Sequence, residues 1–254
     1  TANLLNVLKQ SSFLTLLAIG FTFALITSEL DLSFANICSL AAVTTGALLY
    51  HGYPFALAIV AGIVIGAAGG MLNGFLVTVV RVPSLIATLG TASIAGGAAF
   101  MLTGGVAYVG RWDPRFLFLA KGTVLGVPVL VIVTLAVLAL SMLVSEAMRV
   151  GVHMRATGEA PESARRAGVA VRGMKFLGLT LSGLAAGVTA VLLVANLSSA
   201  SPEMAGDFLL EAIAAVLLGM TMFVPGKANV MGSFVGALII TVLGNGLVLL
   251  GAAY

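Results

Sequence analysis

The stretch LSFANICSLAAVTTGALLYHGYPFALAIVAGIVIGAAGGMLNGFLVTVV, residues 32–80, decides the fold because none of its 49 residues carries a formal charge. As an α-helix it would be about 74 Å long, at 1.5 Å per residue. The hydrocarbon core of a bilayer is about 30 Å thick, so this stretch is long enough to cross it twice. The turn-forming residues 51–54, His-Gly-Tyr-Pro, predict that the two crossings are antiparallel neighbours.

The rest of the chain is equally poor in charge. Of its 254 residues, 60% are hydrophobic and 8% are Asp, Glu, Lys or Arg, against about a quarter charged in an ordinary soluble domain. The composition predicts an all-α polytopic membrane protein that forms one transmembrane domain over residues 1–254. We expect about eight membrane segments, near residues 10–28, 33–50, 54–79, 84–103, 123–145, 175–197, 208–224 and 230–251.

The positive charges are clustered between two apolar segments. Six of the twelve cations lie within residues 149–175, namely Arg149, Arg155, Arg165, Arg166, Arg172 and Lys175. The positive-inside rule predicts that this loop is cytoplasmic. Counting segments outward then places Arg81 and Lys227 inside, and Lys9, Arg111, Arg115 and Lys121 outside. Because the cations do not form a stripe, we expect no nucleic-acid partner.

Three regions depart from simple spans. Only 15 uncharged residues separate Glu211 from Lys227, and they end in Pro225 and Gly226, which predicts a half-helix or re-entrant element. Glu29 and Asp31 lie between two apolar runs, so they mark an interface or face a polar cavity. The outer loop 104–121 carries four aromatic residues, which form either an interfacial aromatic belt or a docking surface for an external partner: Tyr108, Trp112, Phe116 and Phe118.

Glycine recurs every fourth residue on one helical stripe, at Gly62, Gly66, Gly70 and Gly74. Small residues at this spacing let two membrane helices approach backbone to backbone. The favoured interpretation is close helix packing, and the alternative is a stripe that lines a substrate path.

A short polar helix is predicted within TGEAPESARRAGVAV, residues 157–171. Pro161 suits the first turn of a helix, and Gly168 suits the left-handed residue that ends one. The carboxylates precede Arg165 and Arg166, the order that the helix dipole favours. This segment is either a docking element for another protein or a solvated loop with one helical turn.

Catalytic and metal-binding patterns are not found in the sequence. Gly226 and Lys227 form the only Gly-Lys pair, but Thr221 and Ala228 replace the glycine and the hydroxyl residue that a phosphate-binding loop requires. The two histidines are far apart and Cys38 is the single cysteine, so we expect neither a metal site nor a disulfide.

Five stretches resemble the ribose-type permeases of bacterial ATP-binding cassette (ABC) importers, within the branched-chain amino acid, ribose and autoinducer permease superfamily. They are ELDLSFANICSLAA from Glu29, GMLNGFLVTVVRVPSLIATLGT from Gly70, PSLIATLGTASIAGGAAFMLTGG from Pro83, the 157–171 loop, and FLLEAIAAVLLGMT from Phe208. The resemblance implies a bundle of the type II importer class, with ten spans in the complete subunit.

The resemblance also implies the partners and the location. Two permease subunits pair in the bacterial cytoplasmic (inner) membrane, an external binding protein delivers the solute, and separate ATPase subunits hold the ATP and magnesium, so the permease is not an enzyme and needs no cofactor. The loop 149–175 then contains the coupling helix that docks the ATPase. Its docking residues are Gly158, Glu159, Pro161, Glu162, Arg165, Arg166 and Gly168.

The implied function is import of a small polar solute, with a monosaccharide such as ribose as the leading candidate. Autoinducer-2, nucleosides and branched-chain amino acids are the alternatives within the family. Polar residues inside apolar spans are candidates for the solute path or for hydrogen bonds between helices: Asn36, Asn73, Thr88, Thr91, Glu211 and Asn245. The rival classes are an ion-coupled secondary transporter, using Glu29, Asp31 or Glu211, and a membrane-embedded enzyme.

Overall fold

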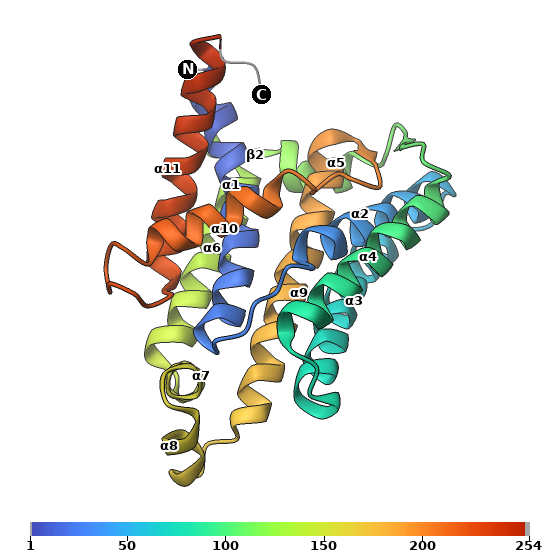
Figure 1. The fold of residues 1–254 in the computed structure, drawn as a ribbon. Helices are drawn as coiled ribbons and strands as arrows, with labels where there is room; N and C mark the ends of the chain where they lie inside the picture. Colours follow the sequence, from blue (N-terminus) through green and yellow to red (C-terminus); the bar gives the residue numbers. More distant parts are fainter. Residues whose placement is uncertain (1, 252–254) are drawn as a thin grey trace.

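The protein is a bundle of membrane-length helices (Figure 1). The structure, a computed structural model, describes residues 2–251, and side chains from Val7 onward. Within this range six helical segments are long and apolar enough to cross a membrane. They are α1 (Ala2–Ile26), α3 (Phe55–Phe75) with the π-helical turn Leu76–Val80, α4 (Ser84–Thr103), α6 (Val129–Met142) with the π-helical turn Leu143–Ala147, α9 (Val171–Leu197) and α11 (Val230–Leu249).

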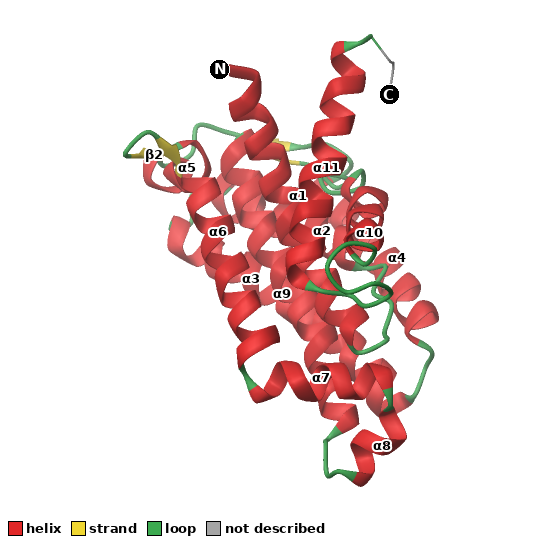
Figure 2. Ribbon diagram, turned by 90° about the vertical axis from the view of Figure 1, so that its left-hand side faces the viewer, coloured by secondary structure: helices red, strands yellow, loops and turns green. Residues whose placement is uncertain are grey.

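Two further apolar helices are shorter, α2 (Phe34–Tyr50) with 17 residues and α10 (Phe208–Gly219) with 12. Together with the six long segments they account for the eight predicted membrane segments and confirm the all-α polytopic architecture. The remaining helices are α5 (Pro114–Lys121), α7 (Arg149–Glu159) and α8 (Pro161–Arg166). α5 lies at one end of the bundle, and α7 and α8 project from the other (Figures 1 and 2).

Helices α1 and α9 form the centre of the bundle. Most of the apolar stretch of each is buried inside the protein, whereas α3, α4, α6 and α11 bury a third or less of theirs. The exposed sides of these four outer helices are rich in Val, Leu and Ile. The outer surface of the bundle is therefore apolar and suited to contact with lipid, as expected of a membrane protein.

The glycine stripe lies where α3 crosses α9. A Cβ atom added at Gly66 would be 2.4 Å from the Cα of Gly187 and 2.5 Å from the carbonyl oxygen of Gly183. A Cβ at Gly70 would be 2.5 Å from the carbonyl oxygen of Leu179. Since these neighbours are backbone atoms, only glycine allows the two helices to come this close.

Two predicted segments were too long. Residues 123–128, expected within a span, form a hairpin of β2 (Thr123–Val124) and β3 (Val127–Pro128). Its two turn residues, Leu125 and Gly126, both have positive φ, which suits a tight hairpin and excludes a helix. The segment expected at 208–224 ends as a helix at Gly219, before Pro225 and the left-handed Gly226. This short helix agrees with the predicted half-helix.

The outer loop is held by protein contacts. β1 (Tyr108–Val109) pairs antiparallel with β4 (Ser199–Ala200), the segment after α9. Trp112 and Phe116 are buried against each other, with ring centroids 5.9 Å apart. The predicted aromatic belt was therefore wrong for these two side chains, because they pack inside the protein core instead of at a membrane interface.

Candidate functional site

The segment from α7 to α8, residues 149–166, forms a projection at one end of the bundle (Figure 2). Met148 is extended and separates α7 from the π-helical turn that ends α6. Ala160 separates α7 from α8, and Pro161 is the first residue of α8. After α8, Gly168 adopts a φ of +83°, so it ends the helix as predicted. The turn between α3 and α4 lies at this same end (Figure 1).

Helix α7 packs directly on the end of α1. A Cβ atom at Gly158 would be 2.1 Å from the carbonyl oxygen of Ile26, so glycine is required for this contact. The Ser28 hydroxyl donates a hydrogen bond to the Gly158 carbonyl at 2.9 Å. Gly158, predicted as an ATPase-docking residue, is thus engaged within the protein itself.

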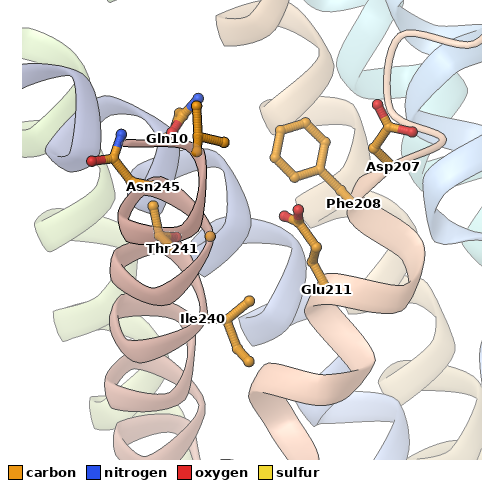
Figure 3. Close-up of a pocket in the computed structure, with 9 residues that line it drawn as sticks. Gln10, Asp207, Phe208, Glu211, Ile240, Thr241 and Asn245 are labelled. Atoms are coloured by element: carbon orange, nitrogen blue, oxygen red, sulfur yellow. The ribbon is translucent and has the colours of Figure 1, made fainter. Parts of the chain in front are cut away.

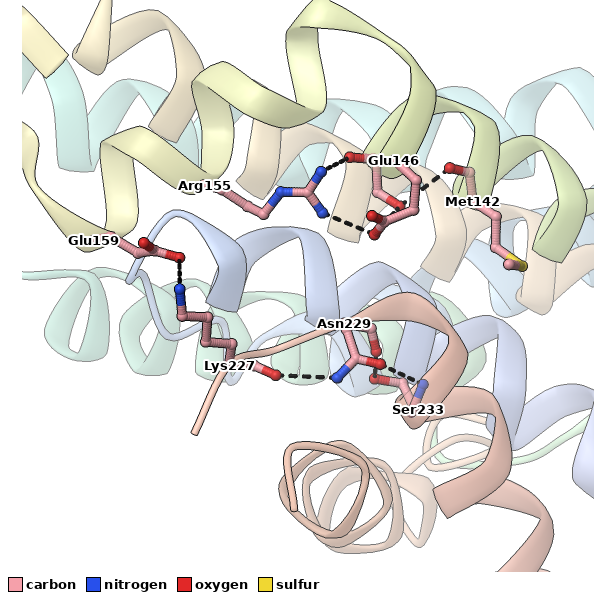
Figure 4. Close-up of polar contacts among 9 residues, drawn as sticks. Met142, Glu146, Arg155, Glu159, Lys227, Asn229 and Ser233 are labelled. Atoms are coloured by element: carbon pink, nitrogen blue, oxygen red, sulfur yellow. Dashed lines mark hydrogen bonds and ion pairs between the residues drawn. The ribbon is translucent and has the colours of Figure 1, made fainter. Parts of the chain in front are cut away.

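Two ion pairs tie the projection to the bundle (Figure 4). Arg155 pairs with Glu146 at 2.8 Å and also donates to the Ser145 carbonyl at 2.6 Å, which holds α7 against the end of α6. Glu159 pairs with Lys227 at 2.8 Å, which joins the end of α7 to the loop between α10 and α11. Glu159, a second predicted docking residue, therefore has an internal partner.

The other five predicted docking residues are exposed on or beside α8: Pro161, Glu162, Arg165, Arg166 and Gly168. Glu162 and Arg165 pair with each other across one helical turn at 2.8 Å. Ala164 is buried, whereas Ala160 and Ala167 are exposed. α8 thus presents a polar, cationic surface to the medium.

Four of the six predicted pathway residues gather around the connection between α1 and α2. Asn73 donates to the Ser33 hydroxyl and accepts from the Thr91 hydroxyl, both at 2.6 Å, and its side chain is buried. Thr88 donates to the Ser84 carbonyl at 2.8 Å and lies 3.3 Å from the Leu30 carbonyl. These contacts join the connection to α3 and α4.

Asn36 completes this group by donating to the Ala92 carbonyl of α4 at 3.0 Å. Buried polar groups with interhelical partners stabilise membrane bundles. The geometry of Asn36, Asn73, Thr88 and Thr91 is that of interhelical hydrogen bonding, the alternative interpretation that the sequence left open.

Replacing Thr91 with Val is expected to destabilise the protein. The substitution keeps the shape of the side chain but removes the donor to the buried Asn73 oxygen. Leaving such an oxygen unpaired costs about 1–3 kcal/mol. The measurement is thermal unfolding in detergent, with Thr44→Val as the matched control, because Thr44 donates to the Leu40 carbonyl of its own helix.

If Thr91 instead lines the solute path, a different result is expected, and the same two variants distinguish the two roles. If Thr91 contacts the solute and not α3, the unfolding temperature of Thr91→Val will equal that of Thr44→Val while the KM for solute uptake changes.

The remaining two predicted pathway residues, Glu211 and Asn245, line a separate cavity of about 330 Å³. It lies among α1, α10 and α11, and its lining includes Gln10, Asp207, Phe208 and Thr241. Figure 3 shows Gln10 and Asn245 on one side, with Asp207 and Glu211 across from them. Carboxylates and amides beside an aromatic ring are groups that hydrogen-bond and cover a polyhydroxylated molecule.

Gln10 and Asp207 of the cavity were not selected from the sequence, whereas Glu29 and Asp31 were predicted to mark an interface or to face a polar cavity. Asp31 is completely buried and accepts hydrogen bonds from the Ser33 amide and hydroxyl, so it lies at neither an aqueous interface nor a lipid face. Glu29 forms an ion pair with Lys175 of α9. Gln10 and Asp207 join the cavity although both lie at the margins of apolar runs. The one available signal was the placement of carboxylates between apolar segments.

Comparison with known proteins places this architecture in a family. Residues 3–254 match the family described as the permease component of the branched-chain amino acid transport system. The chain belongs to this permease family. No solved structure matches the chain.

Three curated relatives are similar to the permease over almost its whole length. The ribose import permease protein of Escherichia coli is 33% identical, covering 99% of this chain and 79% of that protein. The D-allose transport system permease protein of Escherichia coli is 32% identical, covering 97% and 76%. The autoinducer 2 import system permease protein of an Enterobacter species is 29% identical, covering 93% and 74%.

Membership in this family makes the protein the permease of an ABC import system, a transport component rather than an enzyme, and a multi-pass protein of the inner membrane. An import system of this class includes an ATPase and a solute-binding protein. Family membership therefore favours an ABC permease over the two rival classes, an ion-coupled secondary transporter and a membrane-embedded enzyme.

Proposed function

We propose that this permease imports a monosaccharide, with ribose as the leading candidate. Its similarity to permeases named for ribose and D-allose carries the proposal. The cavity lined by Glu211 and Asn245 supports it, because its carboxylates and amides suit the hydroxyl groups of a sugar. Autoinducer-2 is the second candidate, since one similar permease is named for it.

The proposed complex contains two permease subunits, an external binding protein and ATPase subunits docked on the cytoplasmic side. In this arrangement ATP and magnesium belong to the ATPase, and the permease holds no cofactor. The cationic projection of α7 and α8 supports a cytoplasmic position, because Arg81, Lys227 and the six cations of residues 149–175 belong to that end of the bundle.

In the proposed cycle, closure of the ATPase moves α8, and the helices attached to it change the access to the solute path. The contacts between α7 and its neighbours give that movement a route. α7 touches α1 through Gly158, and Glu159 reaches the loop between α10 and α11, the helices that line the cavity. Through these contacts, a displacement of α8 moves the helices that line the cavity.

Proteoliposomes test the proposed function directly. Permease reconstituted with its ATPase and binding protein is expected to import labelled ribose only when ATP is supplied, with no dependence on proton or sodium gradients. Excess unlabelled D-allose and autoinducer-2 then rank the solutes by competition. Gradient-driven uptake by the permease alone, or ATP-driven uptake that ignores every sugar, contradicts the proposal.

The same vesicles test the cavity. Glu211→Gln should lower the rate of ribose uptake about tenfold, the loss expected when a charge-assisted hydrogen bond is removed. Glu203→Gln is the control, because Glu203 is an exposed carboxylate in the preceding loop and does not line the cavity. Equal rates for the two variants would remove Glu211 from the solute path.

A further inference from the structure

A second pocket, of about 410 Å³, lies at the end of the bundle that carries α8. It opens between the turn joining α3 to α4 and the starts of α8 and α9. Its polar lining is dominated by cations, with two carboxylates among them: Arg81, Arg165, Arg172, Lys175, Glu29 and Glu162. We call it the basic pocket.

The positive charge of the basic pocket is only partly neutralised. Both carboxylates are already paired, Glu29 with Lys175 and Glu162 with Arg165. In the part of the chain that the structure describes, Arg81 and Arg172 have no carboxylate within ion-pair distance. The pocket therefore keeps a net charge of about +2 from two guanidinium groups, which bind phosphate in a bidentate manner better than any other side chain.

Two long helices begin at the same pocket and add to this charge. The lining includes Pro83 and Ser84 at the start of α4, and Val171 and Arg172 at the start of α9. Neither of these N-termini has a side-chain capping hydrogen bond within the described residues. The first amide groups of a helix favour an anion, and here two such ends converge on one basic pocket.

The surroundings of the basic pocket show which kind of anion fits. Apolar side chains flank it on the adjoining surfaces of α3 and α4, where Val79, Val80 and Ile86 are more than half exposed. Val77, Val82 and Pro83 continue this apolar surface into the lining. A small soluble anion gains nothing from exposed apolar surface, whereas the acyl chains of a lipid cover it.

We propose that the basic pocket binds the phosphate group of an anionic phospholipid, with its acyl chains against the neighbouring ends of α3 and α4. Arg81 and Arg172 hold the phosphate oxygens. Basic pockets between membrane helices on the cytoplasmic side are suited to such headgroups. The bound lipid would fill the space between the α3–α4 turn and the start of α8.

Native mass spectrometry of the full-length detergent-solubilised permease tests the site, with phosphatidylglycerol as the probe and phosphatidylcholine as the zwitterionic reference. The double variant Arg81→Gln with Arg172→Gln is expected to bind phosphatidylglycerol at least about tenfold more weakly. The charge-preserving variant Arg81→Lys with Arg172→Lys should retain most of the binding. Both pairs keep a Cβ at Arg81, where φ is +67°, so backbone strain is the same in each.

The control removes the same number of cations from the other end of the bundle, by Arg111→Gln with Arg115→Gln. This variant should bind phosphatidylglycerol as the unaltered protein does. Equal loss in the two glutamine variants would show non-specific attraction and overturn the proposal. Displacement of phosphatidylglycerol by excess inorganic phosphate would also overturn it, because the site would then recognise a soluble anion without its lipid.

Discussion

Replacing both Arg165 and Arg166 with Glu is expected to release the ATPase from the permease and abolish ATP-driven import, while the fold stays intact. Both side chains are exposed on α8, and Arg165 is paired only within that helix. The double change alters the local charge from about +2 to −2. Placing like charges at a polar interface costs several kcal/mol, so the affinity should fall by well over tenfold.

Co-purification of the ATPase with the tagged permease measures this effect. Arg111→Glu with Arg115→Glu is the matched control, because those arginines are exposed just before α5 and in its first turn, at the opposite end of the bundle (Figure 1). The control should retain the ATPase. Full retention by the α8 variant, at normal unfolding temperature, would show that docking uses another surface.

The second large effect is expected from adding a single methyl group between α3 and α9. In Gly66→Ala the new Cβ would lie 2.4 Å from the Cα of Gly187, and backbone surrounds it. The helices must separate to admit it. Overpacking of this kind costs about 1–3 kcal/mol, and the loss should be near the upper limit because no side chain can move aside.

Gly97→Ala provides the control for that experiment. Gly97 lies on α4 with nothing within 4 Å of an added Cβ, and alanine is the better helix former. Its unfolding temperature should be equal to or slightly above that of the unaltered protein. If Gly66→Ala melts at the same temperature as Gly97→Ala, the contact between α3 and α9 is less close than described.

Much of the architecture could be predicted because each membrane span appears in the sequence as a continuous run of apolar residues. Uncharged stretches located seven of the eight membrane segments. The eighth contains Glu211, and Pro225 with Gly226 indicated that its helix, α10, is short. The ends of the segments were harder to predict from the sequence. The hairpin at residues 123–128 is as free of charge as a span, and the signals against a helix are Gly126 and Pro128 in the sequence and the positive φ of Leu125 and Gly126 in the structure.

The clusters of side chains were harder to predict, since they depend on pairs far apart in the sequence. Glu29 meets Lys175 across 146 positions, and Asn73 meets Ser33 across 40. A polar residue in an apolar run has the same appearance whether it faces a solute or another helix. Asn73 and Asn245 are each followed by glycine in a long helix, yet the first lies in a hydrogen-bonded network and the second lines a cavity.

Backbone contact between α3 and α9 also restricts how the molecule moves. Sliding between packed helices is normally absorbed by rotation of side chains from one rotamer to another, and at Gly66, Gly183 and Gly187 there is nothing to rotate. We therefore expect the two helices to move together as one unit. We expect a path through the membrane to open where helices are joined by side-chain contacts or single ion pairs, such as Glu159 with Lys227.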